Sequence, residues 1–462
     1  MNLSIPKASD TQDRLPFSRL IAYSSLQLPI AMAALPVVLN VTHYYGEILK
    51  LSLAVMGPIL IISRVLDAIQ DPVIGYVSDR LTHFRHGRLI LVAAMVPLLM
   101  AGFFMLFDPP AMLHPGIDGI SPHPVLLGVW LFFALVLVHL GYSGVSISYH
   151  ALGAELTDDY NERTRVTVGR EVFGLTGMML AVVLPTLLTA RFGEATGYQL
   201  LGIIFLPIAL FAAIPTLFFS PRSVHGPIIA KPGVSIIGSF FAPLKNSLYR
   251  RLLMVFVVNG SALGIAVSVM LFYVEHVLGG GKYQAGMILL AYFTAGAASV
   301  PLWMYLSRRL SKATAWFVGI VLTMVAMSLA AFLGEGDIGW FIAISVVTGM
   351  GLGADYGLPP SILADVINSQ EGKETRGATG AYFGVWALTT KLATAIGAAA
   401  SLPILALLGF NPGRDEYNTH ALVFVYIALP IFVKFIAAAM LWSVRIEAER
   451  PAVREILWRR GG

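Results

Sequence analysis

Long runs of apolar residues alternate with short polar breaks along almost the whole chain. Each run has about 20 residues or more, the length an α-helix needs to cross the hydrocarbon core of a bilayer. The pattern predicts twelve spans, at about 18–42, 51–78, 88–107, 124–149, 170–190, 199–219, 251–275, 284–306, 314–333, 338–365, 377–407 and 420–444. We therefore expect an all-α, polytopic membrane protein.

The longest break, residues 220–250, contains four prolines and several Lys and Arg residues. It predicts a linker between a six-helix bundle over 1–219 and a second over 251–462. Of the 31 Lys and Arg residues, 24 fall on the side of the termini and the linker, and four fall on the other. Because cytoplasmic loops are enriched in Lys and Arg, we expect both termini in the cytoplasm, with the protein in the plasma (inner) membrane.

Composition supports a membrane location, since 57% of the residues are hydrophobic and 12% are charged. Soluble domains carry about 25% charged residues. The net charge of +5 is modest and fits cytoplasmic loops better than nucleic-acid binding. With no cysteine, thiolate nucleophiles and cysteine-ligated metals are excluded. We expect a monomer in contact with membrane lipid, a small-molecule solute as its ligand, no cofactor and no nucleic-acid partner.

Asp67 and Asp71 lie one helical turn apart inside the second apolar run, with Arg64 one turn earlier. A carboxylate within a bilayer costs several kcal/mol, so it faces a cavity or a partner charge. Lys391 lies near the middle of span eleven and needs a counter-charge for the same reason. The two acids repel each other unless Lys391 or a bound cation offsets them. The group can hold a cation or proton, or form a static ion-pair network.

An internal repeat relates the two halves. Residues 71–81 align with 300–310, sharing Pro, Tyr, Ser, Arg and Leu at one offset, and residues 151–165 echo 362–376 with one insertion. Both pairs fall at the cytoplasmic ends of matching spans, which indicates two parallel halves. The second half has Val300 and Arg308 where the first has acids.

Three stretches resemble the glycoside–pentoside–hexuronide:cation symporters, the group that includes melibiose permease. Residues 67–75 with Asp79 and Arg80 are similar to the second-helix signature of that group. Residues 149–164 followed by Arg170 resemble its fourth and fifth helices, and 363–366 with Arg376 and Lys391 its tenth and eleventh. The resemblance implies the major facilitator fold and cation-coupled symport of a sugar or glycoside by alternating access. It does not imply an enzyme.

The resemblance also implies roles for individual residues. Asp67 and Asp71 would hold the coupling ion, Na⁺ or H⁺, and Lys391 would approach them. The further candidates for the cation site are Gln70, Ser143 and Ser146; those for substrate binding and coupling are Arg64, Arg170, Lys391, Asp355, Gln27, Tyr149 and Trp386; those for a cytoplasmic gate are Asp79, Arg80, Glu155, Arg163, Asp365 and Arg376.

The chain departs from that pattern in ways that leave the substrate open. Gln70 stands where sodium-using members often have Asn, so the coupling ion can be sodium or a proton. Spans one and four contain no acid, whereas melibiose permease binds its galactoside through acids there. Either other polar groups accept hydrogen bonds from a sugar, or the solute is lipid-like, as for the animal lysophospholipid symporters that resemble the same family. An intramembrane aspartyl enzyme is a remote alternative.

Three polar residues in later or peripheral positions carry expectations of their own. Asp355 lies in a span rich in glycine and proline, where a bent helix can line a cavity, so it can accept a substrate hydroxyl or pair with Lys391. Lys434 in span twelve is expected to extend to the cytoplasm. His139 is expected to be a core histidine with its hydrogen bonds satisfied.

Overall fold

The computed structural model describes residues 15–84, 86–115, 123–157, 159–221, 236–369, 378–410 and 419–443. Within these ranges the chain is built of helices, with no strand. Eleven helical segments of the described chain are long and apolar enough to cross a membrane. A further helix, Leu53–Arg80, has 28 residues and is as long as the others, but it carries Arg64, Asp67 and Asp71. This arrangement is consistent with the twelve predicted spans.

The helices of the first half are α1 (Phe17–Ser24), α2 (Gln27–Leu39), α3 (Val41–His43), α4 (Leu53–Arg80), α5 (Gly87–Phe107), α6 (Pro124–Ala154), α7 (Tyr160–Phe192) and α8 (Glu194–Phe219). Those that follow are α9 (Ile236–Phe241), α10 (Ser247–His276), α11 (Lys282–Arg309), α12 (Lys312–Leu329), α13 (Ile338–Asn368), α15 (Thr379–Leu407), α16 (Thr419–Val423) and α17 (Leu429–Ser443). The helices α1 and α2 together form the first span, and α16 and α17 belong to the last.

The fifth span begins earlier than the hydropathy pattern predicts. The predicted start is residue 170, whereas α7 begins at Tyr160. Asp159 determines this start, because its carboxylate accepts hydrogen bonds from the backbone N–H groups of Asn161 and Glu162 and so caps the helix. The polar first turns of α7 lie in the protein interior, which is why an apolar window misses them.

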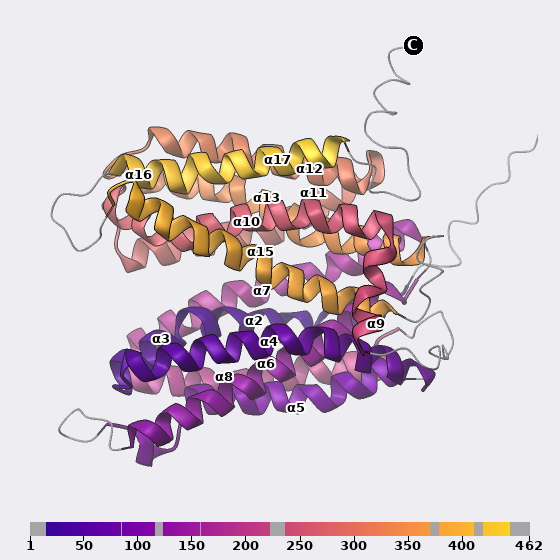
Figure 1. Cartoon of the computed structure of the whole chain (residues 1–462), viewed down its shortest axis with the longest axis horizontal. Helices are drawn as coiled ribbons and strands as arrows, with labels where there is room; N and C mark the ends of the chain where they lie inside the picture. The colour runs from indigo at the N-terminus through magenta and orange to yellow at the C-terminus, as the bar shows by residue number, and fades with distance from the viewer. Residues whose placement is uncertain are drawn as a thin grey trace, which may run out of the picture.

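Two layers of helices form the molecule (Figure 1). The helices α1–α8, coloured indigo to magenta, gather in one layer, and α10–α17, coloured pink to yellow, gather in the other. Contacts between the layers are made mainly by α15 with α4 and by α7 with α11 and α13. The limits of the two bundles at residues 219 and 250 stay a prediction.

Close contact between α4 and α15 depends on glycine. A Cβ atom on Gly75 would lie 2.5 Å from the carbonyl oxygen of Gly380, and one on Gly384 would lie 2.8 Å from the carbonyl oxygen of Asp71. Real Cβ atoms do not approach backbone this closely, so only glycine permits the crossing. The crossing brings the helix that carries Lys391 against the helix that carries both acids.

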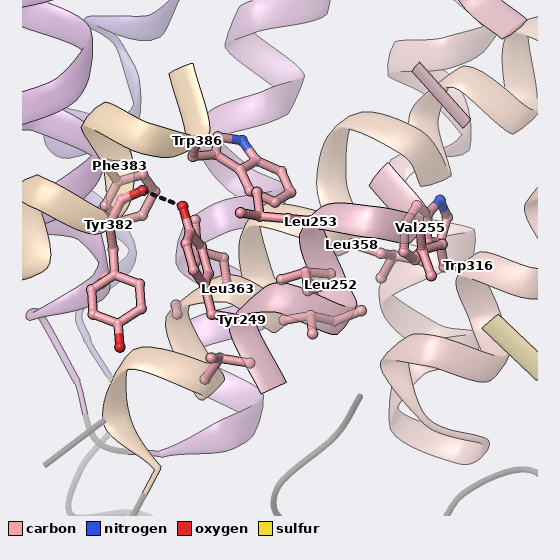
Figure 2. Close-up of a cluster of buried hydrophobic side chains, with 14 of the residues drawn as sticks. Tyr249, Leu252, Leu253, Val255, Trp316, Leu358, Leu363, Tyr382, Phe383 and Trp386 are labelled. Atoms are coloured by element: carbon pink, nitrogen blue, oxygen red, sulfur yellow. Dashed lines mark hydrogen bonds between the residues drawn. The ribbon is translucent and has the colours of Figure 1, made fainter. Parts of the chain in front are cut away.

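A large buried cluster in the second half packs α10, α12, α13 and α15 together (Figure 2). The Tyr249 hydroxyl donates a hydrogen bond of 2.8 Å to the backbone oxygen of Tyr382. Trp386 packs its indole against Phe256, with ring centroids 4.0 Å apart, and only 7% of the residue is exposed. Burial of aromatic rings on this scale fixes the register of α15 against α10.

Candidate cation and substrate site

Lys391 bridges the two halves through the acid pair. Its Nζ atom lies 2.7 Å from Asp67 Oδ1 and 2.8 Å from Asp71 Oδ2, so α15 is tied to α4 by two ion pairs. Asp67 is 2% exposed and Asp71 is fully buried, whereas a quarter of the Lys391 side chain is accessible. The ammonium enters from an accessible side and occupies the space between the carboxylates.

Two more polar groups complete this cluster. The Ser143 hydroxyl on α6 donates a hydrogen bond of 3.3 Å to Asp67 Oδ1 and accepts one of 3.2 Å from Lys391. The Gln70 amide donates to Asp67 Oδ1 at 3.1 Å. With both acids ionised, the cluster has one more negative than positive charge. Carboxylate, hydroxyl and amide oxygens are hard donors, which suit an alkali cation.

Two residues that sequence spacing assigns to this cluster lie outside it. The Ser146 hydroxyl turns back to the carbonyl oxygen of Ser143 and does not contact the acids. Arg64 is exposed, and within the described part of the chain it makes no ion pair or hydrogen bond. It lies on the same face of α4 as Asp71 but two turns earlier, at a position where its side chain is exposed. In this conformation Arg64 therefore does not pair with the acids, and its expected role in substrate binding and coupling stays a prediction.

A second polar cluster lies between α2, α6 and α7. Arg170 donates from Nε and Nη2 to the same oxygen of Glu171, at 3.0 and 2.7 Å, and both residues are almost fully buried. Next to them, His150 Nε2 and Gln27 Oε1 are 3.0 Å apart. The sequence pattern indicated Arg170 and Gln27 but not Glu171, because a span that starts at residue 170 places Glu171 in its first turn, beside the polar break. On the observed helix, Glu171 is about 16 Å from the start of α7, well inside the span.

Tyr149 has a packing role in the structure. Its ring stacks on Tyr23 with centroids 4.5 Å apart. Each hydroxyl donates to the partner's backbone oxygen, Tyr149 at 2.7 Å and Tyr23 at 3.0 Å. This reciprocal pair closes α1 against α6 beneath the Arg170 cluster.

The second half also has a buried ion pair, which corrects two expectations. Lys434 on α17 does not extend to the cytoplasm: its Nζ lies 3.1 Å from Asp355 Oδ2 and donates to Asn259 Oδ1 at 2.8 Å. Asp355 therefore pairs with Lys434 and not with Lys391. Its other oxygen accepts from Trp316 at 2.7 Å and from Asn259 at 3.0 Å. The cluster joins α10, α12, α13 and α17.

Charged residues predicted to form a gate meet at one end of the molecule. Arg88 donates to both carboxylate oxygens of Glu155, at 3.0 and 2.7 Å, and to Asp79 at 3.0 Å. The Asp79 carboxylate also accepts from the backbone N–H groups of Gly380 and Ala381, at 2.5 and 2.8 Å. It thus caps the first turn of α15 from the opposite half.

A separate ion pair joins the halves nearby. Arg163 on α7 pairs with Asp365 on α13 at 2.8 Å, and Lys312 contacts the other oxygen of the same carboxylate. We call this end, with Asp79, Arg163, Asp365 and Gly380, the closed end. Arg80 lies over the ring of Tyr76 at 5.0 Å, and Arg376 is outside the described residues.

The sequence profile of the family described as MFS/sugar transport protein matches residues 20–448 of the chain. This chain belongs to that family. The family is one of membrane transporters, so the chain is an integral membrane transporter of a small-molecule solute and not an enzyme. The resemblance and the fold class inferred from the sequence are confirmed.

Curated relatives cover most of the chain at low identity. An uncharacterized symporter of Synechocystis sp. is 22% identical, over 83% of this chain and 84% of the relative. The isoprimeverose transporter of Lactiplantibacillus pentosus is 21% identical, over 95% and 91%. The sodium-dependent lysophosphatidylcholine symporter 1-A of Danio rerio is 22% identical, over 88% and 82%.

Solved structures share the fold. A bacterial homologue of the iron transporter ferroportin, in an outward-facing state, has a TM-score of 0.65 at 17% identity, covering 93% of this chain and all of the other. The fucose:proton symporter of E. coli has a TM-score of 0.58 at 13% identity, covering 91% and 98%. At these identities the likeness is one of fold alone.

Proposed function

We propose that this chain couples the entry of a sugar or glycoside to a Na⁺ or H⁺ gradient by alternating access. The observation that carries the proposal is the Lys391 ammonium between Asp67 and Asp71, since it joins the two halves at a pair of acids inside a predicted span. The proposal includes termini in the cytoplasm, insertion in the inner membrane and a monomeric state with no cofactor.

The coupling step follows from the charge of this cluster. A Na⁺ ion or a proton adds one positive charge to a group that carries two negative charges and one positive charge. The acids then no longer require the ammonium, and Lys391 is released toward the accessible side. Because Lys391 belongs to α15 and the acids belong to α4, ion binding changes the contact between the halves.

Transport also requires that the closed end opens. The pairs Arg163–Asp365 and Asp79–Gly380 cross between the halves there, so they must break when the site faces the other side. These contacts are proposed as the gate; with both termini in the cytoplasm, as proposed, the described conformation is one with the cytoplasmic side shut.

Uptake into proteoliposomes tests the proposal. The wild-type protein is expected to accumulate a radiolabelled glycoside against its gradient when sodium or pH gradients are imposed. Asp71→Asn is expected to remain folded but to abolish accumulation, because it removes one of the two charges that the ion neutralises. Wild-type accumulation ratios in that variant would refute the role of Asp71.

A second candidate is transport of a lysolipid. It is favoured by the acid-free first and fourth spans and by the Danio rerio relative, whose name states that solute. Thermal unfolding against glycosides and lysophosphatidylcholine, with and without sodium, separates the two. A ligand at about 100 times its dissociation constant adds about 2.7 kcal/mol of apparent stability, and a shift with lysolipid alone would select the second candidate.

A further inference from the structure

Glu171 uses only half of its carboxylate within the protein. Both hydrogen bonds from Arg170 go to Oε1, and no residue in the described part of the chain donates to Oε2. Only 4% of the residue is exposed. The Oε2 atom nevertheless keeps some accessible surface, because the fully buried side-chain atoms without a hydrogen-bond partner do not include it. A carboxylate oxygen this buried is normally hydrogen-bonded, because an unpaired one costs stability. It is therefore available to a ligand.

The side-chain amide of Gln27 lies close to that oxygen, beside Gly174. A Cβ atom on Gly174 would lie 3.3 Å from Glu171 Oε2, 3.5 Å from Gln27 Nε2 and 3.0 Å from Gln27 Cγ. The free acceptor and the Gln27 amide thus border the same small space above the glycine. Gln27 Oε1 is already paired with His150, which leaves Nε2 directed to this space.

The space adjoins both the acid pair and the second half. His150 and Ser143 are seven residues apart on α6, which is two turns on one face and about 10 Å. Ser143 contacts Asp67, whereas His150 packs edge-on against Phe383 of α15 at 6.0 Å between centroids. A ligand held here would contact the helix that carries Lys391.

We propose that Glu171 Oε2, Gln27 Nε2 and His150 form a binding subsite for the hydroxyl groups of a neutral polyol, with Gly174 as its floor. The proposal rests on the proposed transport of a sugar or glycoside and supplies the acid that spans one and four lack. A hydroxyl donates to Glu171 and accepts from Gln27, so the pair matches what one sugar hydroxyl offers. Arg170 already neutralises the carboxylate, which favours a ligand without net charge.

Adding a methyl group at Gly174 tests the proposed subsite without removing any polar group. Gly174→Ala fills the space between Oε2 and Nε2, and it meets only the side chains of Gln27 and Glu171, with no backbone atom among its nearest neighbours. Gly169→Ala is the matched control, since it lies on the same helix and its Cβ would meet neighbours at 3.5–3.7 Å, an ordinary contact. Both changes raise helix propensity equally. Glu171→Gln, which keeps an oxygen acceptor, gives a second and independent variant.

Binding of methyl β-D-xyloside, methyl β-D-galactoside and isoprimeverose to the purified full-length protein would be measured by titration calorimetry. We expect Gly174→Ala to weaken binding by about tenfold or more, Gly169→Ala to change it by less than about twofold, and Glu171→Gln to weaken it by about tenfold, since a hydrogen bond to a charged group is lost. Melting temperatures without ligand serve as the folding control.

Other outcomes would overturn the inference. Equal glycoside affinity in Gly174→Ala and Gly169→Ala would remove the subsite while leaving symport of a glycoside intact. Loss of lysophosphatidylcholine binding in Glu171→Gln, with glycoside binding unchanged, would assign the carboxylate to a cationic headgroup. Absence of glycoside binding to the wild-type protein would overturn the proposed function and the subsite together.

Discussion

Lys391 Nζ and Asp67 Oδ1 are 2.7 Å apart although the residues belong to different halves of the molecule. Replacement of Lys391 by Ala is expected to tighten cation binding by at least about tenfold, because a positive charge about 4 Å away is worth several kcal/mol at a protein-like dielectric. The same change should remove coupling between cation and solute. Cation titrations with and without glycoside check both effects, and Lys50→Ala, an exposed lysine outside the spans, is the control.

The Lys434–Asp355 pair is expected to contribute to stability only as a pair. Lys434→Met leaves a buried carboxylate without its counter-charge and should cost about 3 kcal/mol of unfolding free energy. The double variant Lys434→Met, Asp355→Asn should recover most of that loss. Thermal unfolding of the wild-type protein and these two variants forms the measurement. If the single and double variants melt at the same temperature, the pair has no net stabilising coupling.

Removal of the cross-half ion pair should open the closed end. Because the sequence has no cysteine, a single introduced thiol reports on one position. Ser361 is fully buried against Thr164 across the halves, at 3.4 Å between hydroxyls. Ser361→Cys is expected to react with a maleimide several-fold faster when Asp365→Asn is also present. Ser52→Cys, exposed near the opposite end, should not gain reactivity, and equal rates at position 361 would exclude Asp365 from the gate.

His139 has both ring nitrogens buried without a hydrogen-bond partner among the described residues, which corrects the expectation of a satisfied core histidine. If it is only a packing residue, His139→Leu should melt at the same or a higher temperature, because a buried unpaired polar group is removed. Retained glycoside uptake completes the check. A lower melting temperature with lost cation dependence would instead show that the ring binds something in the working protein.

The sequence predicted those site features that follow from the cost of charge in a membrane. Asp67, Asp71 and Lys391 lie at similar depths in their spans, and each needs a partner, so their meeting could be expected. The same reasoning does not say which way a helix faces. Lys434 was placed toward the cytoplasm although α17 turns it inward to Asp355. Arg64 lies on the same face of α4 as Asp71, but it is exposed, whereas Asp71 is buried.

Glu171 escaped prediction for a different reason. The polar residues at 160–169 shift the apolar window toward the far end of the span, so that about three turns of α7 look like a loop. Asp159 as an N-cap, with Glu162 three residues later, was the signal that could have revealed the true start. A cap is a local signal, and in this helix it is more informative than hydropathy.

Asp79 caps the first turn of α15, and Lys391 lies twelve residues along that helix, about 18 Å from the cap. The Asp79 carboxylate of the other half therefore binds the first turn of α15, and the carboxylates of Asp67 and Asp71 bind Lys391 near the middle of the same helix. A tilt of about 10° around the capped end would move the ammonium by about 3 Å, the full length of its ion pairs. The rigid rod of α15 converts a small angular motion into the difference between a bound and a free lysine.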